Sequence, residues 1–124
     1  MPKRVLDVGQ CGFDHGAIRR LVEGRFAAEV VQAHRLDDAI ERLKSGPFDL
    51  VLVNRKLDAD YSDGLEVLRA IKADAALART PVMLVSNYPD AQQAAVAIGA
   101  EPGFGKSELN QASTHEKLRP FLAG

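Results

Sequence analysis

The chain has 124 residues and a mass of 13.4 kDa, a size that fits one compact domain over residues 1–124 and is too short for two. Sixteen Lys and Arg balance seventeen Asp and Glu, so the net charge of −1 provides no long-range field to gather nucleic acid or an anionic membrane. The single Cys11 excludes an intramolecular disulfide and a thiolate metal site, as expected for a protein of a reducing cytoplasm.

The sequence also shows no sign of membrane insertion or export. No stretch approaches the ~20 apolar residues that span a bilayer, and the first residues, MPKRVLDVGQCG, lack the long apolar region of a signal peptide. No repeat, low-complexity tract or linker interrupts the chain. We therefore expect a cytoplasmic protein with no membrane partner.

Short apolar runs alternate with segments of helical periodicity. The runs are short and rich in β-branched residues, which favours strands, and the segments between them each present one apolar stripe, which favours amphipathic helices. In chain order the sequence predicts strands at 5–8, 28–31, 50–53 and 82–85 and a short strand around Phe104. A helix is predicted after each of the first four strands, and the apolar residues expected to face the core are Ile18, Leu21 and Val22 in the first, Ala39, Ile40 and Leu43 in the second, Leu65, Leu68 and Ile71 in the third, and Ala91, Ala94, Ala95 and Ile98 in the fourth. A last helix is predicted at 114–122.

Turn and capping residues agree with these limits. Asp14 and Asp37 are predicted to cap helix starts, Gly24 and Gly46 stand where helices should stop, and Pro81 precedes the fourth strand. Strict alternation of strand and helix predicts a parallel, doubly wound sheet with right-handed crossovers. The third and fourth strands are apolar without alternation, as expected for central strands with helices on both faces.

In such a sheet the ligand or reactive site lies beyond the carboxyl ends of the strands. The residues that follow the strands are therefore the candidates for function: Gly9, Gln10, Asn54, Ser86, Asn87 and Lys106.

Four local pieces of sequence resemble the receiver domains of response regulators, the CheY-like family. FDLVLVN at 48–54 resembles the third strand of a receiver, DGLEVLRAIK at 63–72 the following helix, TPVMLVSN at 80–87 the fourth strand, and GAEPGFGK at 99–106 the fifth. The resemblance extends over almost the whole chain. It implies an α/β three-layer sandwich with five parallel strands in the flavodoxin-like order 2-1-3-4-5, and a non-enzymatic role in two-component (phosphorelay) signalling in bacteria.

The resemblance also implies a phosphorylation site, which this chain keeps only in part. Typical receivers have a phosphorylated Asp after the third strand, an acidic pair for Mg²⁺ after the first, a Thr or Ser after the fourth and a Lys after the fifth. Ser86 and Lys106 match, but Asn54 replaces the phosphoacceptor, and Gly9 and Gln10 replace the acidic pair. A neutral amide is a poor nucleophile and a weak ligand for a hard cation. We therefore expect that this site is not phosphorylated and that it binds no metal ion and no cofactor.

Other positions depart from the family pattern as well. The aromatic residue that usually changes rotamer in the fifth strand is Gly103 here, the Pro that usually follows the lysine is Ser107, and the loop at 55–62 is about two residues longer than usual. These departures predict an atypical receiver that acts by protein contact without phosphorylation.

Two buried or charged residues near the site need partners. We expect Lys106 to find an acceptor in Asn54, Gln10 or Asp7, or to reach water, because an unpaired buried ammonium is costly. Asp7 stands in an apolar strand, and a buried hydrogen bond is favoured over a displaced ligand role, which stays open. Of the acidic residues in the following loop, Asp63 is predicted to cap the third helix.

Two alternatives remain for the function. In the first, a receiver is phosphorylated at a non-standard carboxylate, Asp58 or Asp60. In the second, Ala100–Ser107 is a phosphate-binding loop of a nucleotide-binding protein, since it nearly fits GxxxxGK[ST]. That loop should follow a strand and open a helix, whereas this segment follows a helix and contains the predicted fifth strand, so the second alternative is disfavoured.

The family resemblance also implies where a partner would bind. Receivers commonly dock proteins or dimerise through the face formed by the fourth helix, fifth strand and fifth helix, and this analogy predicts a protein partner or a homodimer there. The predicted surface residues are Gln92, Gln93, Glu101, Phe104 and Glu108.

Overall fold

The computed structural model describes residues 2–123, in which five strands alternate with five helices. The α-helices and strands follow the predicted order, and a short 3₁₀ turn, η1, precedes the last helix. Their bounds are β1 Lys3–Val8, α1 Gly12–Arg25, β2 Ala28–Ala33, α2 Leu36–Ser45, β3 Leu50–Asn54, α3 Gly64–Ala73, β4 Val82–Val85, α4 Pro89–Ile98, β5 Glu101–Phe104, η1 Lys106–Glu108 and α5 Ala112–Leu122.

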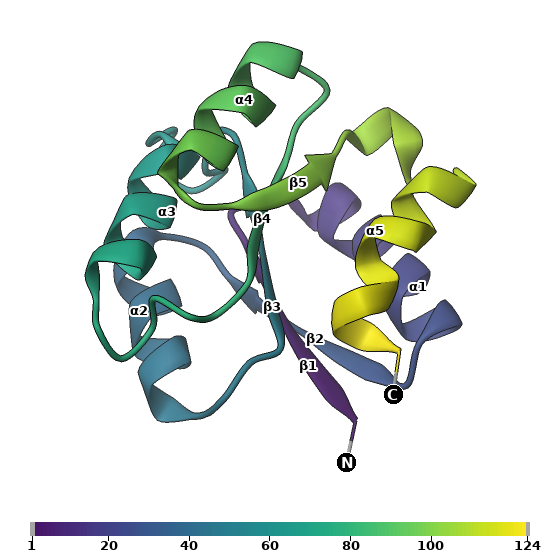
Figure 1. Cartoon of the computed structure of the whole chain (residues 1–124), viewed down its shortest axis with the longest axis horizontal. Coiled ribbons are helices and arrows are strands. Elements are labelled where there is room, and N and C mark those ends of the chain that lie inside the picture. The colour runs from purple at the N-terminus through teal and green to yellow at the C-terminus, as the bar shows by residue number, and fades with distance from the viewer. Residues whose placement is uncertain (1, 124) are drawn as a thin grey trace.

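The strands form one parallel sheet in the order β2-β1-β3-β4-β5, which confirms the predicted flavodoxin-like topology. Figure 1 shows α1 and α5 on one face of this sheet and α2, α3 and α4 on the other. The direction in which successive strands are added to the sheet reverses between β1 and β3, and doubly wound proteins place their sites at the carboxyl ends of the strands at this point. No helix in residues 2–123 is long and apolar enough to cross a membrane.

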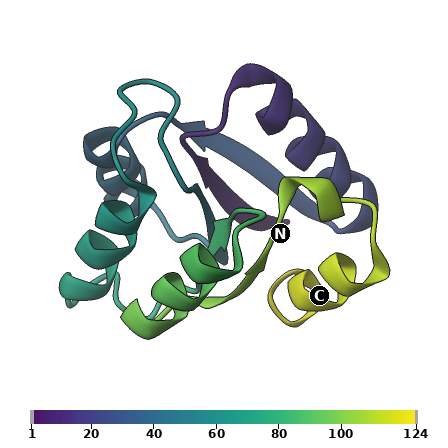
Figure 2. The ribbon, with the colours of Figure 1, turned by 90° about the horizontal axis from the view of Figure 1, so that it is seen from above.

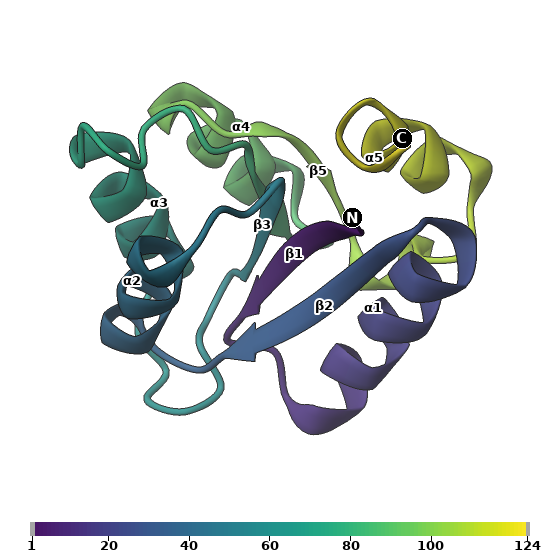
Figure 3. The same ribbon diagram turned by 90° about the horizontal axis from the view of Figure 1, so that it is seen from below.

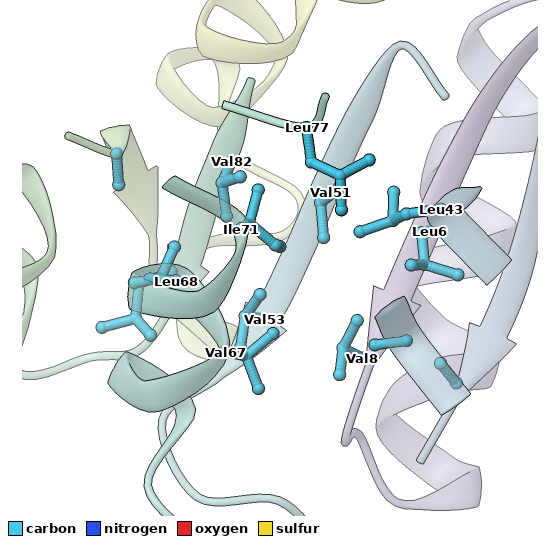
Figure 4. Close-up of a cluster of buried hydrophobic side chains, with 14 of the residues drawn as sticks. Leu6, Val8, Leu43, Val51, Val53, Val67, Leu68, Ile71, Leu77 and Val82 are labelled. Carbon is cyan, nitrogen blue, oxygen red and sulfur yellow. The ribbon is translucent and has the colours of Figure 1, made fainter. Parts of the chain in front are cut away.

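Side chains of the central strands alternate between two hydrophobic cores, one on each face of the sheet. On the side of α2 to α4, Val51 and Val53 of β3 pack with Leu68 and Ile71 of α3, as Figure 4 shows. On the other side, Leu50 and Leu52 belong to the cluster that α1 and α5 cover. All four β3 residues are fully buried, which explains why this strand carries no polar alternation.

The helix ends correct part of the predicted capping. Cys11, not Asp14, is the N-cap of α1, and its Sγ accepts a hydrogen bond from Asp14 N; the helix then passes Gly24 and ends at Arg25. At α2, Asp38 rather than Asp37 accepts the hydrogen bonds of the preceding backbone amides. Asp63 does cap α3, because its side chain accepts from Leu65 N at 2.9 Å.

The edge strand β5 corrects one predicted surface residue. Pro102 is tolerated there because an edge strand leaves one row of amides unpaired. Phe104, predicted on the docking surface, is only 1% exposed and packs in the core beneath α1 and α5. The strand turns its last two residues inward, so Phe104 contributes to the core and not to a surface.

Candidate functional site

The predicted site residues follow the carboxyl ends of the strands. Figure 3 shows that the long segment after β3 and the start of α1 both lie at the end toward which the strand arrowheads point, and Figure 2 shows the same two segments next to each other from the opposite side. Gly9, Asn54, Ser86 and Lys106 come from four different strand ends along this edge.

Asn54 uses its amide as a donor. Nδ2 donates to the carbonyl oxygen of Gly9 at 3.1 Å and to that of Lys56 at 2.7 Å, so the side chain ties the end of β1 to the segment after β3. A carboxylate has no hydrogen to donate and would face two carbonyl oxygens in this position. The local backbone is therefore arranged for an amide and against an ionised aspartate.

Gly9 lies in a conformation that excludes an acidic side chain. Its φ is +78°, and a Cβ built on it would lie 2.4 Å from Leu57 Cδ2 and 3.0 Å from Leu57 Cα. The carbonyl of Gly9 accepts a second hydrogen bond, from Asp58 N at 2.9 Å, which holds the loop against β1. Glycine is thus required here by both the backbone angle and the approach of Leu57.

The Mg²⁺ site that the family resemblance implies does not fit the residues present. Gly9 offers no side-chain ligand, Asn54 directs its amide nitrogen to carbonyls, and Gln10 is 1% exposed with both amide atoms unpartnered. Within residues 2–123, no three His, Cys, Asp or Glu side chains are grouped so that they could hold a metal ion. A hard divalent cation needs several anionic or carbonyl oxygens around it, and this edge does not supply them.

Lys106 pairs with an acceptor that was not among those predicted, and its side chain is also 32% exposed, as in the predicted alternative that it reaches water. Its Nζ lies 2.8 Å from Asp14 Oδ2, and it reaches none of Asn54, Gln10 or Asp7 within hydrogen-bond distance. The hydrogen bond from Lys106 lowers the pKa of the Asp14 carboxyl. Because both side chains are partly exposed, the pair adds little stability, but it fixes the ammonium at this edge of the sheet.

A second pair, formed by Asp7 and His15, lies deeper in the protein. Asp7 is fully buried, and its Oδ2 lies 2.7 Å from His15 Nδ1, which confirms the predicted buried hydrogen bond. Burial raises the pKa of Asp7 to about 6, although the hydrogen bond from His15 acts in the opposite direction. Asp7 Oδ1 has no partner in the described structure. This carboxyl is therefore unusually easy to protonate.

The ends of β3 and β4 enclose a small cavity of about 220 Å³. Asn54, Ser86 and Lys106 all line it, so the structure brings these three predicted residues together, whereas Gln10 lies outside. Asn87, another predicted candidate, also lines the cavity, and three residues that the sequence did not single out as candidates complete the polar lining: Arg55, Lys56 and Tyr88.

Hydrogen bonds fix the segments that follow β4 and β5. Gln92 Nε2 donates to the carbonyls of Leu84, Ser86 and Phe104 at 2.9, 3.1 and 3.4 Å, and its Oε1 accepts from Gly103 N at 3.1 Å. One side chain of α4 therefore joins both strands at the point where their register shifts.

Gly103 leaves the space that this arrangement needs. A Cβ at position 103 would lie 2.0 Å from the carbonyl oxygen of Leu84 and 2.9 Å from Gln92 Oε1. The aromatic residue of the family pattern is thus incompatible with the observed contact between β4 and β5. A further link is provided by Asn87, whose Oδ1 accepts from both the amide and the hydroxyl of Ser107.

A larger groove of about 700 Å³ lies over α4, β5 and α5. Gln92, Gln93 and Glu108 of the predicted docking surface line it, and the exposed Val96 adds an apolar side chain. Glu101 is exposed but is not part of the groove lining.

Comparison with known proteins identifies the family. The model of the response regulator receiver domain matches residues 14–108, which is more than half of the chain. The chain belongs to the response regulator receiver family.

Solved receiver structures share the fold at low sequence identity. The signal receiver domain of a DNA-binding response regulator from Colwellia psychrerythraea 34H is 24% identical, with a TM-score of 0.79 over 95% of this chain and 96% of that one. The chemotaxis protein CheY4 of Vibrio cholerae is 18% identical, with a TM-score of 0.79 over 98% and 100%. The Mn²⁺-bound form of the response regulator Rcp1 is 20% identical, with a TM-score of 0.71 over 97% and 94%. As a receiver domain, the chain is a module of two-component signalling, a system in which receivers contact protein partners.

Proposed function

We propose that this chain is an atypical receiver that acts by protein contact and without a phosphorylation cycle. The observation that carries the proposal is the position of Asn54, whose amide nitrogen is held between the carbonyls of Gly9 and Lys56 where a receiver presents its nucleophile. Phosphoryl transfer to a carboxylate needs an ionised oxygen and a cation to neutralise the phosphoryl oxygens. Neither is provided by the residues of this edge.

The contacts of Gln92 support a single conformation of the signalling face, the surface formed by α4, β5 and α5. Gln92 joins α4 to β4 and β5 through four hydrogen bonds, and Gly103 replaces the aromatic side chain that would otherwise change position. A receiver whose output face is fixed in this way offers the same surface at all times. We therefore place the partner, or a second copy of the chain, in the groove over α4, β5 and α5.

The alternative of a displaced phosphoacceptor has less support. Asp60 Oδ1 already accepts hydrogen bonds from the amide and hydroxyl of Ser62, at 3.0 and 2.6 Å, which lower the pKa of this carboxyl. Neither Asp58 nor Asp60 lines the cavity that contains Ser86 and Lys106.

Incubation with acetyl phosphate and Mg²⁺, followed by intact-mass measurement, tests the phosphorylation part of the proposal. We expect no phosphoryl adduct under conditions that label a receiver with an intact aspartate. A stable adduct that disappears in Asp58→Asn or Asp60→Asn would establish the displaced phosphoacceptor instead.

The docking part needs a matched pair of surface variants. Val96 lines the groove and is 45% exposed, whereas Phe13 is 80% exposed at the start of α1, away from the groove. We expect Val96→Arg to abolish capture of the partner, or dimerisation in size-exclusion chromatography, and Phe13→Arg to leave both unchanged. The reverse result would move the docking surface to α1.

A further inference from the structure

The two edges of the sheet are closed to different extents. At the β5 edge, Gly103 N donates to Gln92 Oε1 at 3.1 Å and Gly103 O accepts from Lys117 Nζ at 2.9 Å, so side chains of α4 and α5 occupy both backbone groups. At the other edge, β2 pairs only with β1, and Figure 3 shows it as the outermost strand on that side. An edge strand with unpaired amides and carbonyls can accept a further strand.

The register of β2 shows which of its backbone groups point away from the sheet. Lys3 N donates to Ala27 O and Gly9 N donates to Ala33 O, both at 2.9 Å. The backbone groups of successive residues point to opposite sides of a strand, so the odd-numbered residues of β2 bond with β1 and the even-numbered residues point outward. The outward residues are Ala28, Val30 and Gln32.

A side chain of α1 covers the middle of this outer edge. Glu23 Oε2 accepts a hydrogen bond of 2.9 Å from Val30 N, and this bond lowers the pKa of the Glu23 carboxyl. Glu23 Oε1 pairs with Arg19 at 3.1 Å, which helps to hold the carboxylate over the strand. Within residues 2–123, neither Gln32 N nor the carbonyls of Val30 and Gln32 take part in a hydrogen bond. The edge is therefore closed by Glu23 at Val30 and left unpaired at Gln32.

The outward residues are placed symmetrically about Val30. A second β2 that runs antiparallel, with Val30 opposite Val30, would place Ala28 of each copy opposite Gln32 of the other. Directly opposite residues of an antiparallel pair can exchange both of their backbone hydrogen bonds. A two-fold axis at Val30 therefore pairs every outward residue of one copy with an outward residue of the other.

The charges on the strand agree with this register. Glu29 is the only charged residue of β2, and it would lie opposite Val31 of the second copy, so no two carboxylates face each other. Each Glu29 also keeps its own counter-ion, because it pairs with Arg4 of β1 at 3.1 Å. The edge is thus complementary to itself in both hydrogen bonding and charge, which favours a second copy of the chain over an unrelated strand.

We propose that the outer edge of β2 is a self-association surface, on which a second copy of this chain adds its own β2 in antiparallel orientation, and that Glu23 limits this association by occupying Val30 N. In the pair, the Val30 carbonyl of one copy replaces the Glu23 carboxylate as the acceptor for the Val30 amide of the other. The surface lies at the opposite edge of the sheet from the groove over α4, β5 and α5. The inference therefore goes beyond the proposed docking function and does not rest on it.

Sedimentation equilibrium over a range of protein concentrations tests the role of Glu23. We expect Glu23→Ala to tighten the monomer–dimer equilibrium at least about tenfold relative to the wild type, because a charged acceptor no longer competes for Val30 N. Glu41→Ala is the matched control, since Glu41 is exposed in α2 and has no hydrogen bond or ion pair within the described chain. Arg19→Ala keeps the carboxylate and should resemble the wild type.

Hydrogen exchange locates the interface. The unpaired Gln32 amide should exchange quickly in the monomer, and we expect its protection in Glu23→Ala to rise with protein concentration, while the Gly103 amide at the other edge keeps a constant rate. Adding Gln32→Pro to Glu23→Ala should abolish the dimer, because proline has no N–H and is tolerated where an edge strand faces solvent. If the proline variant fails to fold, the concentration dependence of Gln32 exchange still decides.

Three results would overturn the proposal. They are equal association of Glu23→Ala and the wild type, equal association of Glu41→Ala and Glu23→Ala, and a Glu23→Ala dimer in which Gln32 stays unprotected. Loss of the Glu23→Ala dimer on addition of Val96→Arg would also overturn it, because Val96 lines the groove at the other edge. Unchanged partner capture in the single variant Val96→Arg would overturn the proposed docking groove alone.

Discussion

Asn54 Nδ2 donates a hydrogen bond of 3.1 Å to the carbonyl oxygen of Gly9, and this contact joins the ends of β1 and β3, the neighbouring strands at which the order of strand addition reverses. In a phosphorylatable receiver the same region must keep a carboxylate free to react. Here the amide is a structural link, so the substitution has a physical role in the folded state.

Asn54→Asp is therefore expected to destabilise the protein without restoring phosphorylation. The ionised carboxylate would face two carbonyl oxygens and remove the Asn54 donor from both, so that the carbonyl of Gly9 would keep only the amide of Asp58, at a cost of about 1–3 kcal/mol near pH 7. The carbonyls raise the pKa of the introduced carboxyl, so the loss should shrink as the pH falls and the protonated form regains a donor.

Urea unfolding at several pH values measures this effect. Asn110→Asp is the control, because Asn110 is exposed and the charge change is the same. Equal stability of Asn54→Asp and the wild type near pH 7 would show that the amide contacts contribute nothing. A phosphoryl adduct on Asn54→Asp would show that the remaining residues suffice for the chemistry.

Restoring an acidic residue at position 9 should be more disruptive. Gly9→Asp places a Cβ 2.4 Å from Leu57 Cδ2 at a φ of +78°, so both the backbone and the buried Leu57 must move. We expect a loss of about 2–4 kcal/mol in the free energy of unfolding.

Gly24→Ala is the matched glycine control for that experiment. Gly24 lies within α1, and an added Cβ would meet nothing within 4 Å. The replacement should stabilise the helix by about 0.5–1 kcal/mol. If both glycine variants were equally tolerated, Gly9 would not be required for the observed loop.

Gln92→Ala tests the link between α4 and the sheet edge. The variant removes an amide that donates to three carbonyls and accepts from Gly103 N, and we expect a loss of about 1–3 kcal/mol. Hydrogen exchange of the Gly103 amide should accelerate more than that of amides in β1.

Gln93→Ala is the neighbouring control for Gln92. Gln93 is exposed on the same helix, and within the described chain its side chain has no hydrogen bond. A similar acceleration of exchange in both variants would mean that α4 is held by its apolar contacts and that Gln92 does not fix the signalling face.

The sequence predicted those features that depend on local patterns. The fully apolar β3 and β4 indicated central strands, and the position of Asp63 before an apolar periodic segment indicated a helix cap; both are observed. Four of the predicted candidates, Asn54, Ser86, Asn87 and Lys106, share one cavity because the carboxyl ends of parallel strands meet at one edge.

The features that were missed depend on side chains that approach from distant elements. Lys106 pairs with Asp14, 92 positions away, because the first turn of α1 brings a carboxylate over the end of β5. Asp14 was assigned to capping, although any carboxylate in that turn lies close to the strand ends. Phe104 was placed on the surface by the family analogy, and the four residues of β5 are too few for their pattern to show that its side chain faces the core.

Asp7 predicts a specific pH dependence of stability. Its pKa rises from 3.8 in the unfolded chain to about 6 when folded, since burial outweighs the opposing hydrogen bond of His15 and the field of Lys106. The folded state therefore binds this proton more tightly than the unfolded state does, and the contribution of Asp7 to stability falls as the pH rises from about 4 to 6. A shift of about two pKa units corresponds to about 2–3 kcal/mol.

Asp7→Asn should remove this dependence, because an amide cannot ionise but can still hydrogen-bond with His15 Nδ1. We expect the free energy of unfolding of the wild type, relative to Asp7→Asn, to decrease between pH 4 and 6 and to level off above pH 7. The exposed Asp90→Asn provides the control and should follow the wild type throughout. Parallel curves for wild type and Asp7→Asn would mean that the Asp7 carboxyl keeps its ordinary pKa, and that the contact with His15 fully offsets the cost of burial.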